Sequence, residues 1–388
     1  MDRPRRTTTG VTAMEFGFFA QGAVPEPLRL TNPALEHDRM MESVEIAVQS
    51  EQWGFKYAWA SEHHFLTEYS HMAAPEVWGA FVGARTSTLH VGAAITNTTP
   101  AVNHPVRIAE QVATLDHLTE GRYEFGTGRG SSTTEMGGFG VTDWDLTRDM
   151  WRETLREFKK MWEQDAYSHE GQFFSMPERN VVPKLYKPTP PPMWVAAGNP
   201  ETFEIAAADG LGVLCFAFGP PLKSRIPDAV RAYKAAIGSC DPVTGYANDN
   251  ILCVTNMICC EDRNDAFKLA SEIGMSYYHS QVLKWLDTFP RPKGVPEWPE
   301  LIPEPTPDEV EALAATGAII AGDPDDCARG VEIYQSIGID QLVFSPLTTQ
   351  IGIDDALAHF ELFGKEVLPR FDIDPVHSTT RYREAAGK

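Results

Sequence analysis

The sequence is poor in positive charge, in paired cysteines and in long hydrophobic runs. Its 388 residues include 33 lysines and arginines against 54 aspartates and glutamates, a formal net charge of −21. Nucleic acids and anionic membrane surfaces attract basic proteins, so neither is an expected partner. No apolar stretch approaches the roughly 18 residues that span a bilayer. The six cysteines form no CxxC pair, which favours buried free thiols in a reducing compartment.

The N-terminal residues 1–13 are basic but contain no apolar segment of the kind that a secretory signal needs. We therefore expect a disordered leader on a cytoplasmic protein. Hydrophobic residues make up 43% of the chain and charged residues 22%, which leaves ample material for a folded core.

Three common ligand-binding signatures are also missing. Residues 121–132 (GRYEFGTGRGSS) contain three closely spaced glycines, but Ser131 stands where the dinucleotide fingerprint GxGxxG requires the last glycine. No GxxxxGK[ST] loop and no GxSxG elbow occurs. What remains is a glycine-rich turn that carries Arg129, whose guanidinium suits a phosphate group. The alternative is a tight turn with a solvent-exposed arginine.

Strand-like and helix-like patterns alternate along the chain. Eight such repeats indicate a (β/α)8 barrel, with a doubly wound sheet as the competing architecture. Pro105 and Pro200 fall where helices should begin, and Gly210 and Gly338 fall where helices should end. The expected strands are Glu15–Phe19, Phe55–Ala60, Leu89–Ile95, Arg122–Gly126, Met193–Ala197, Gly212–Phe216, Ile251–Cys259 and Gln341–Ser345.

Two stretches interrupt this alternation. Residues 166–192 are rich in turn formers and predict an irregular insertion before the fifth strand. Residues 284–316 hold many of the prolines and follow the seventh strand. A long irregular segment inside a compact domain is typical of an active-site lid, and we expect this one to be mobile without ligand.

A cluster of titratable side chains follows the second expected strand. Glu62, His63 and His64 come directly after the apolar run FKYAWA, and His71 lies close behind. Polar residues at the C-terminal ends of barrel strands are typically catalytic, and a histidine there can act as a general base near neutral pH. The alternatives are a structural histidine and a metal site, but adjacent histidines rarely reach one ion.

The fifth strand is followed by a second candidate anion site. Asn199 suits a helix N-cap, Pro200 the first helical position, and Thr202 lies one turn in. Backbone N–H groups at such a helix start can bind an anion. Ordinary capping explains the same residues, but two such sites after adjacent strands would face one end of the barrel.

Several stretches together resemble the bacterial luciferase-like flavin monooxygenases. They are EHHF, VGAAI, HPVRIAEQVATLDHLTEGRYEFGTGRG, WVAAGNPETFEIAAADG and AGDPDDCARGVEIYQSIGIDQLVF. The resemblance covers residues 14–370 and implies one (β/α)8 barrel over that range, followed by a C-terminal tail at 371–388.

The resemblance also implies roles for individual residues. His63 matches the catalytic histidine of the family and Glu62 the neighbouring position beside the flavin. Ala93 and Ala94 match a non-proline cis peptide that lies against the flavin ring. The positions that match the cofactor phosphate site are Arg129, Arg148, Ala197, Gly198, Asn199 and Thr202.

The implied reaction uses reduced FMN and O2, through a flavin peroxide, to oxygenate a small organic substrate. Because no nicotinamide fingerprint is present, a separate flavin reductase would supply the reduced FMN. Gly128 replaces the reactive cysteine of light-emitting luciferases, which argues against light emission. The alternatives are a deazaflavin-dependent hydride-transfer enzyme of the same fold, a non-catalytic flavin-binding protein and a metal-dependent barrel hydrolase.

A homodimer is expected from the segment Ala73–Ala84, AAPEVWGAFVGA. Its helix would be apolar on nearly every face, so its outer side also needs cover. The family pairs its subunits through this region.

Overall fold

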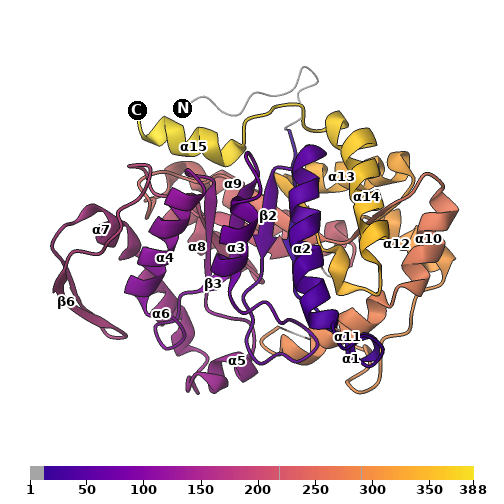
Figure 1. Cartoon of the computed structure of the whole chain (residues 1–388), viewed down its shortest axis with the longest axis horizontal. Coiled ribbons are helices and arrows are strands. Elements are labelled where there is room, and N and C mark those ends of the chain that lie inside the picture. The colour runs from indigo at the N-terminus through magenta and orange to yellow at the C-terminus, as the bar shows by residue number, and fades with distance from the viewer. Residues whose placement is uncertain (1–12, 218, 290) are drawn as a thin grey trace.

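Eight parallel strands close into a barrel in the computed structural model, which describes residues 13–217, 219–289 and 291–388 (Figure 1). The predicted leader lies outside the described residues except for its last position. The barrel confirms the predicted fold, and the doubly wound alternative is wrong. Around the barrel the strand order is β1 (Glu15–Ala20), β12 (Gln341–Phe344), β9 (Ile251–Thr255), β8 (Gly212–Phe216), β7 (Met193–Ala196), β4 (Tyr123–Gly128), β3 (His90–Asn97) and β2 (Tyr57–Ala60).

The interior of the barrel is filled by large side chains that glycines on neighbouring strands accommodate. The rings of Trp59 and Trp194 meet edge to face with centroids 5.3 Å apart. A methyl group at Gly92 would fall 2.5 Å from the Trp59 ring, and one at Gly212 would fall 2.4 Å from the Trp194 ring. The two tryptophans therefore fit only because both positions are glycine.

Helices surround the strands, and the predicted start and stop signals hold. Pro105 and Pro200 occupy first turns, while Gly210 and Gly338 end their helices with φ of 71° and 95°. The helices are α1 (Glu26–Arg29), α2 (Leu35–Gln52), α3 (Pro75–Gly83), α4 (Pro105–Leu118), α5 (Thr133–Gly138), α6 (Leu146–Leu155), α7 (Phe158–Glu163), α8 (Pro200–Asp209), α9 (Ile226–Ala236), α10 (Arg263–Glu272), α11 (Met275–Trp285), α12 (Pro307–Ala314), α13 (Pro324–Ile337), α14 (Ile353–Glu366) and α15 (Ser378–Ala386), with 3-10 turns at Pro221–Lys223, Ile237–Ser239, Pro346–Thr348 and Leu368–Arg370.

Both irregular segments contain regular structure. The insertion at 166–192 includes an antiparallel hairpin of β5 (Tyr167–Glu170) and β6 (Ser175–Arg179). The segment 284–316 includes the end of α11 and all of α12. The seventh expected strand was too long, because only β9 belongs to the barrel. Its continuation, β10 (Met257–Cys259), pairs with β11 (Ile320–Gly322) in a separate small sheet.

The C-terminal helix α15 closes the end of the barrel opposite α5 and α11 (Figure 1). Its Ser378 N–H donates to Glu15 Oε1 at 2.9 Å, and Thr379 Oγ1 donates to Glu124 Oε1 at 2.6 Å. Arg383 forms a buried ion pair with Asp116 at 2.8 Å. The segment 371–388, which the sequence assigns to a tail, thus covers buried charges at the base of the barrel.

Candidate active site

His63 lies just beyond β2 and is held by a buried glutamate from α5. Its Nδ1 lies 3.0 Å from Oε1 of Glu135, and the same oxygen accepts the backbone N–H of His64 at 3.0 Å. Only 2% of Glu135 is exposed. Because this oxygen already accepts a backbone hydrogen, Nδ1 of His63 is the donor, and Nε2 is the nitrogen left to meet a reactant.

The ring of His63 also contacts Tyr69, which stacks on a second tyrosine. The His63 ring meets Tyr69 edge to face at 5.1 Å, and Tyr69 stacks on Tyr278 of α11 at 5.6 Å. Burial raises the pKa of both phenols, so they stay neutral over the physiological range. The imidazole is therefore held by a carboxylate and packed against an aromatic ring.

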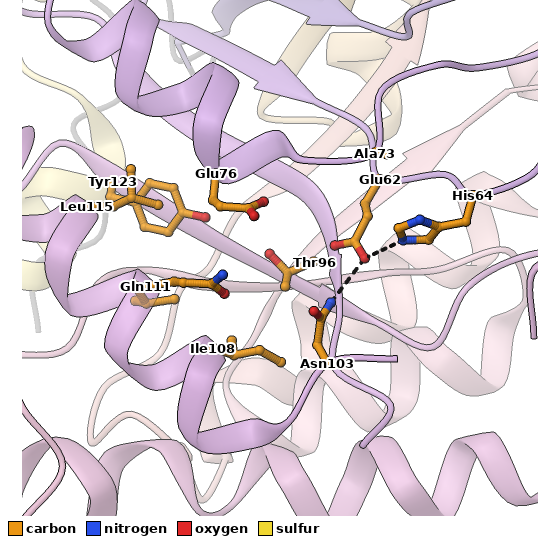
Figure 2. A pocket seen from close by; sticks show the side chains of 11 residues that line it. Glu62, His64, Ala73, Glu76, Thr96, Asn103, Ile108, Gln111, Leu115 and Tyr123 are labelled. Atoms are coloured by element: carbon orange, nitrogen blue, oxygen red, sulfur yellow. Dashed lines mark hydrogen bonds and ion pairs between the residues drawn. The ribbon is translucent and has the colours of Figure 1, made fainter. Parts of the chain in front are cut away.

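Glu62 points into a pocket whose lining comes largely from β3, β4, α3 and α4 (Figure 2). Its Oε2 accepts the Asn97 backbone N–H at 3.0 Å. Its Oε1 accepts Asn103 Nδ2 at 3.2 Å and lies 3.0 Å from His64 Nε2. Glu62 thus ties the end of β2 to the loop that follows β3.

The cis peptide expected at Ala93–Ala94 is found one bond later, at Ala94–Ile95. The prediction was right about the segment and wrong about the bond. The pairing register of β3 with β4 shifts between Ala93 and Thr96, around this peptide. Ala94 packs with the side chains inside the barrel, and the Ala93 carbonyl lies over Gly126, where a methyl group would fall 1.9 Å from it.

The predicted phosphate residues come together at the adjacent ends of β4 and β7. Arg129 donates to Thr147 Oγ1 at 2.9 Å and lies 4.6 Å above the Trp144 ring. Burial, and then the positive charge of Arg148, lower the pKa of Arg129. Arg148 reaches across to Glu201 in the first turn of α8, at 2.8 Å. Two guanidinium groups and a helix start therefore share one region.

Asn199 caps the N-terminus of α8, as ordinary helix capping predicts. Asn199 Oδ1 accepts the Thr202 N–H at 3.0 Å and the Thr202 hydroxyl at 3.1 Å. The Ala197 N–H donates to the Leu214 carbonyl within the barrel, at 2.8 Å. Gly198 lies under Phe289, since a methyl group there would fall 2.0 Å from that ring. An anion at the N-terminus of α8 would compete with the Asn199 side chain for the Thr202 N–H.

Sequence reasoning missed Glu135, and a local pattern explains why. Ser132 and Glu135 form the S-x-x-E spacing of a capping box, which suggests a purely structural pair. The Ser132 hydroxyl does cap α5 by accepting the Thr134 N–H at 3.2 Å. Glu135 turns instead to His63, which is 72 residues earlier in the chain.

Neither a metal-binding cluster nor a membrane-spanning helix is found among the described residues. No three histidine, cysteine, aspartate or glutamate side chains among them gather in a way that could hold a metal ion. Across the same residues, no helix combines the length and apolarity that a bilayer crossing requires.

Comparisons with known proteins point to one family. The model of the luciferase-like monooxygenase family matches residues 14–341. The oxygenase component of flavin-dependent trigonelline monooxygenase from Acinetobacter baylyi is 23% identical, over 88% of this chain and 93% of that protein. An F420-dependent glucose-6-phosphate dehydrogenase from Segniliparus rotundus is 24% identical, over 85% of this chain and 93% of that protein. An uncharacterized Sinorhizobium fredii protein is 33% identical, but the match spans 48% of this chain and 53% of the relative.

Solved structures show the same fold. The oxygenating constituent of 3,6-diketocamphane monooxygenase from Pseudomonas putida, solved in complex with FMN, superposes with a TM-score of 0.74. That match covers 94% of this chain and all of the other at 17% identity, which supports the fold alone. Together with the family match across most of its length, the barrel shows that this chain belongs to the luciferase-like monooxygenases.

Proposed function

We propose that the protein is an FMN-dependent monooxygenase that uses reduced FMN and O2 to oxygenate a small organic substrate. The observation that carries the proposal is the pair Arg129 and Arg148 beside the start of α8, at the ends of two adjacent barrel strands. In a chain with a net charge of −21, two clustered guanidinium groups at the barrel mouth are a local arrangement for an anion.

The residues fit a phosphate group chemically. A carboxylate, that of Glu201, already lies 2.8 Å from Arg148, so the region accepts an anion at this distance. The side chains of Glu201 and Arg148 are 58% and 36% exposed, and such surface pairs contribute little stability. A phosphate with greater charge could therefore replace Glu201 on Arg148 while Arg129 approaches from its place over Trp144.

Reduced FMN, when bound, would supply the electrons that activate O2. The protein would bind the phosphate, exclude water and manage protons. With Nδ1 of His63 fixed on Glu135, Nε2 can take up or release a proton at a reactant in the mouth of the barrel. The resemblance places the peptide between Ala93 and Ala94 against the flavin ring, and we propose that the ring would lie along this part of β3.

The segment after α11 would shelter this region. Asp287 accepts the Thr133 N–H at 2.9 Å, and Thr288 Oγ1 donates to the Ser131 carbonyl at 2.8 Å. Phe289 then covers Gly198. We propose that these contacts open for the cofactor and close again to exclude water, as loops over reactive sites do.

A separate reductase would supply the reduced FMN. The Acinetobacter baylyi relative is an oxygenase component, which supports a two-component system. The six cysteines are all unpaired, which supports a reducing, cytoplasmic location.

The second candidate is a deazaflavin-dependent hydride-transfer enzyme, because F420-dependent dehydrogenases are among the relatives. Anaerobic titration with reduced FMN and with reduced F420, followed by admission of O2, separates the candidates. We expect tight binding of reduced FMN, O2 uptake and an oxygenated product from a panel of aldehydes, ketones and aromatic compounds. Preference for F420 without O2 uptake would overturn the proposal, and binding without turnover on any substrate would indicate a non-catalytic flavin-binding protein.

A further inference from the structure

A polar pocket of about 50 Å³ lies on the outer side of the barrel wall, between β3 and β4 and the helices α3 and α4 (Figure 2). Four titratable side chains line it: Glu62, His64, Glu76 and Tyr123. A water molecule needs about 10–15 Å³ of such volume and two to four polar partners, so several can fit. Neither His63 nor the residues of the predicted phosphate region line this pocket.

Glu62 and His64 form a fixed pair at one end of this pocket. Glu62 accepts hydrogen bonds from a backbone N–H and a side-chain amide, and its remaining contact is His64 Nε2 at 3.0 Å. Burial would lower the pKa of His64, but the hydrogen bond and charge of Glu62 outweigh it and raise the pKa. The contact with Glu62 therefore favours the protonated form of His64.

Glu76, in the first turn of α3, faces that pair across the pocket (Figure 2). Burial raises the pKa of its carboxyl, and the negative charge of Glu62 raises it further. The remaining titratable group, the Tyr123 phenol, stays neutral because burial raises its pKa. Burial and the neighbouring carboxylate therefore both favour the protonated form of Glu76.

We propose that the Glu76 carboxyl group, which faces the Glu62–His64 pair across this pocket, supports the protonated form of His64 when it is ionised. The charge of His64 acts in turn on Glu135, whose Oε1 accepts the His64 N–H and holds His63. Glu76 is a positioning residue, because it touches no reacting atom.

A simpler role for Glu76 makes a different prediction. An acidic side chain in the first turn of a helix stabilises the helix dipole. That role alone predicts a small loss of stability on removal of the charge, with an unchanged pH profile of product formation. The positioning role predicts that the titration of His64 and this pH profile shift together.

The first test is NMR titration of His64 in the whole chain without cofactor, with its signal assigned from a His64→Gln spectrum. In Glu76→Gln we expect the pKa of His64 to fall by roughly 0.5–1 unit, because a nearby negative charge is lost. Glu76→Asp keeps the charge and should retain the wild-type curve. Glu45→Gln on α2, which removes an exposed acid paired with Arg85, is the matched control. A His64 curve in Glu76→Gln that matches wild type would overturn the proposal.

The second test rests on the proposed function and measures the pH profile of product formation. In Glu76→Gln, the pH at which product formation falls on the acidic side should shift by about as much as the pKa of His64. The affinity for reduced FMN should stay unchanged. A shifted His64 curve with an unmoved profile would contradict the link to His63. Absence of oxygenation in the wild-type protein would instead count against the proposed function, and the NMR result would still decide the role of Glu76.

Discussion

Oε1 of Glu135 accepts both Nδ1–H of His63 and the backbone N–H of His64, each at 3.0 Å. One buried oxygen thus fixes the tautomer of the imidazole and the path of the chain beside it. His63→Ala should leave phosphate binding nearly intact while product formed per reduced flavin oxidised falls by about 10²–10⁴. The measurement is coupling on folded mutant protein, and coupling equal to wild type would remove His63 from catalysis.

Glu135→Gln keeps the shape of the side chain but removes the charge that holds His63. Product formation should fall roughly 10- to 100-fold, less than the loss of the general acid–base itself, and its pH profile should shift. Affinity for reduced FMN should not change. A variant with a normal pH profile and normal rate would show that the contact is only structural.

Arg129→Ala should weaken FMN binding by about 10- to 100-fold, since a charge-assisted hydrogen bond contributes roughly 1.5–3 kcal/mol. Arg148→Ala should have a smaller effect, because its side chain is 36% exposed. Arg152→Ala, one turn further along α6, is the control. Equal affinity in all three variants would refute the phosphate assignment.

The base of the barrel should weaken at acidic pH. Burial lowers the pKa of His90 and of His377 to about 3, and their rings stack 3.9 Å apart. Both are neutral when folded and charged when unfolded below pH 6.5. Stability is therefore lost as pH falls from about 6.5 towards 3, by up to ~1.4 kcal/mol per pH unit for each histidine.

Chemical denaturation at several pH values measures this slope. The carboxyl of Glu124, whose pKa burial raises to about 8, acts in the opposite sense and costs stability as pH rises from 4.5 to 8. In Glu124→Gln, the free energy of unfolding should depend less on pH around neutrality. Its loss at acidic pH, which the two histidines cause, should remain. A loss at acidic pH that is unchanged in His377→Asn would refute the assignment to the histidines.

A homodimer should form through the outer face of α3. Val77 and Phe81 are 65% and 49% exposed there, whereas Trp78 and Val82 point inward. Val77→Asp combined with Phe81→Asp should give a monomer by light scattering at micromolar concentration. Leu30→Asp, at another exposed apolar position, should leave the dimer intact. A wild-type monomer would contradict the prediction outright.

The barrel strands could be read from the sequence because each is a local signal, an apolar run bounded by turn formers. The helix starts at Pro105 and Pro200 were equally local. The contact between His63 and Glu135 could not be predicted from the sequence. Glu135 matches a capping pattern within its own helix, and only the tertiary structure brings it next to His63. The cis bond was placed one bond too early because it was carried over from the family resemblance, which gives the segment but not the local register of β3 with β4.

The contacts of α15 have a consequence for biosynthesis. Glu15, near the start of the barrel, has its carboxylate completed by Ser378, 363 residues later. While the chain is still on the ribosome, the carboxyl groups of Glu15 and Glu124 lack the hydrogen bonds that α15 donates, although Glu15 keeps Lys56 and Tyr57 as partners and Glu124 keeps His90 and Trp194. Each hydrogen bond missing from a buried acid weakens the partly built barrel. The barrel should thus gain its full stability only after α15 has been translated.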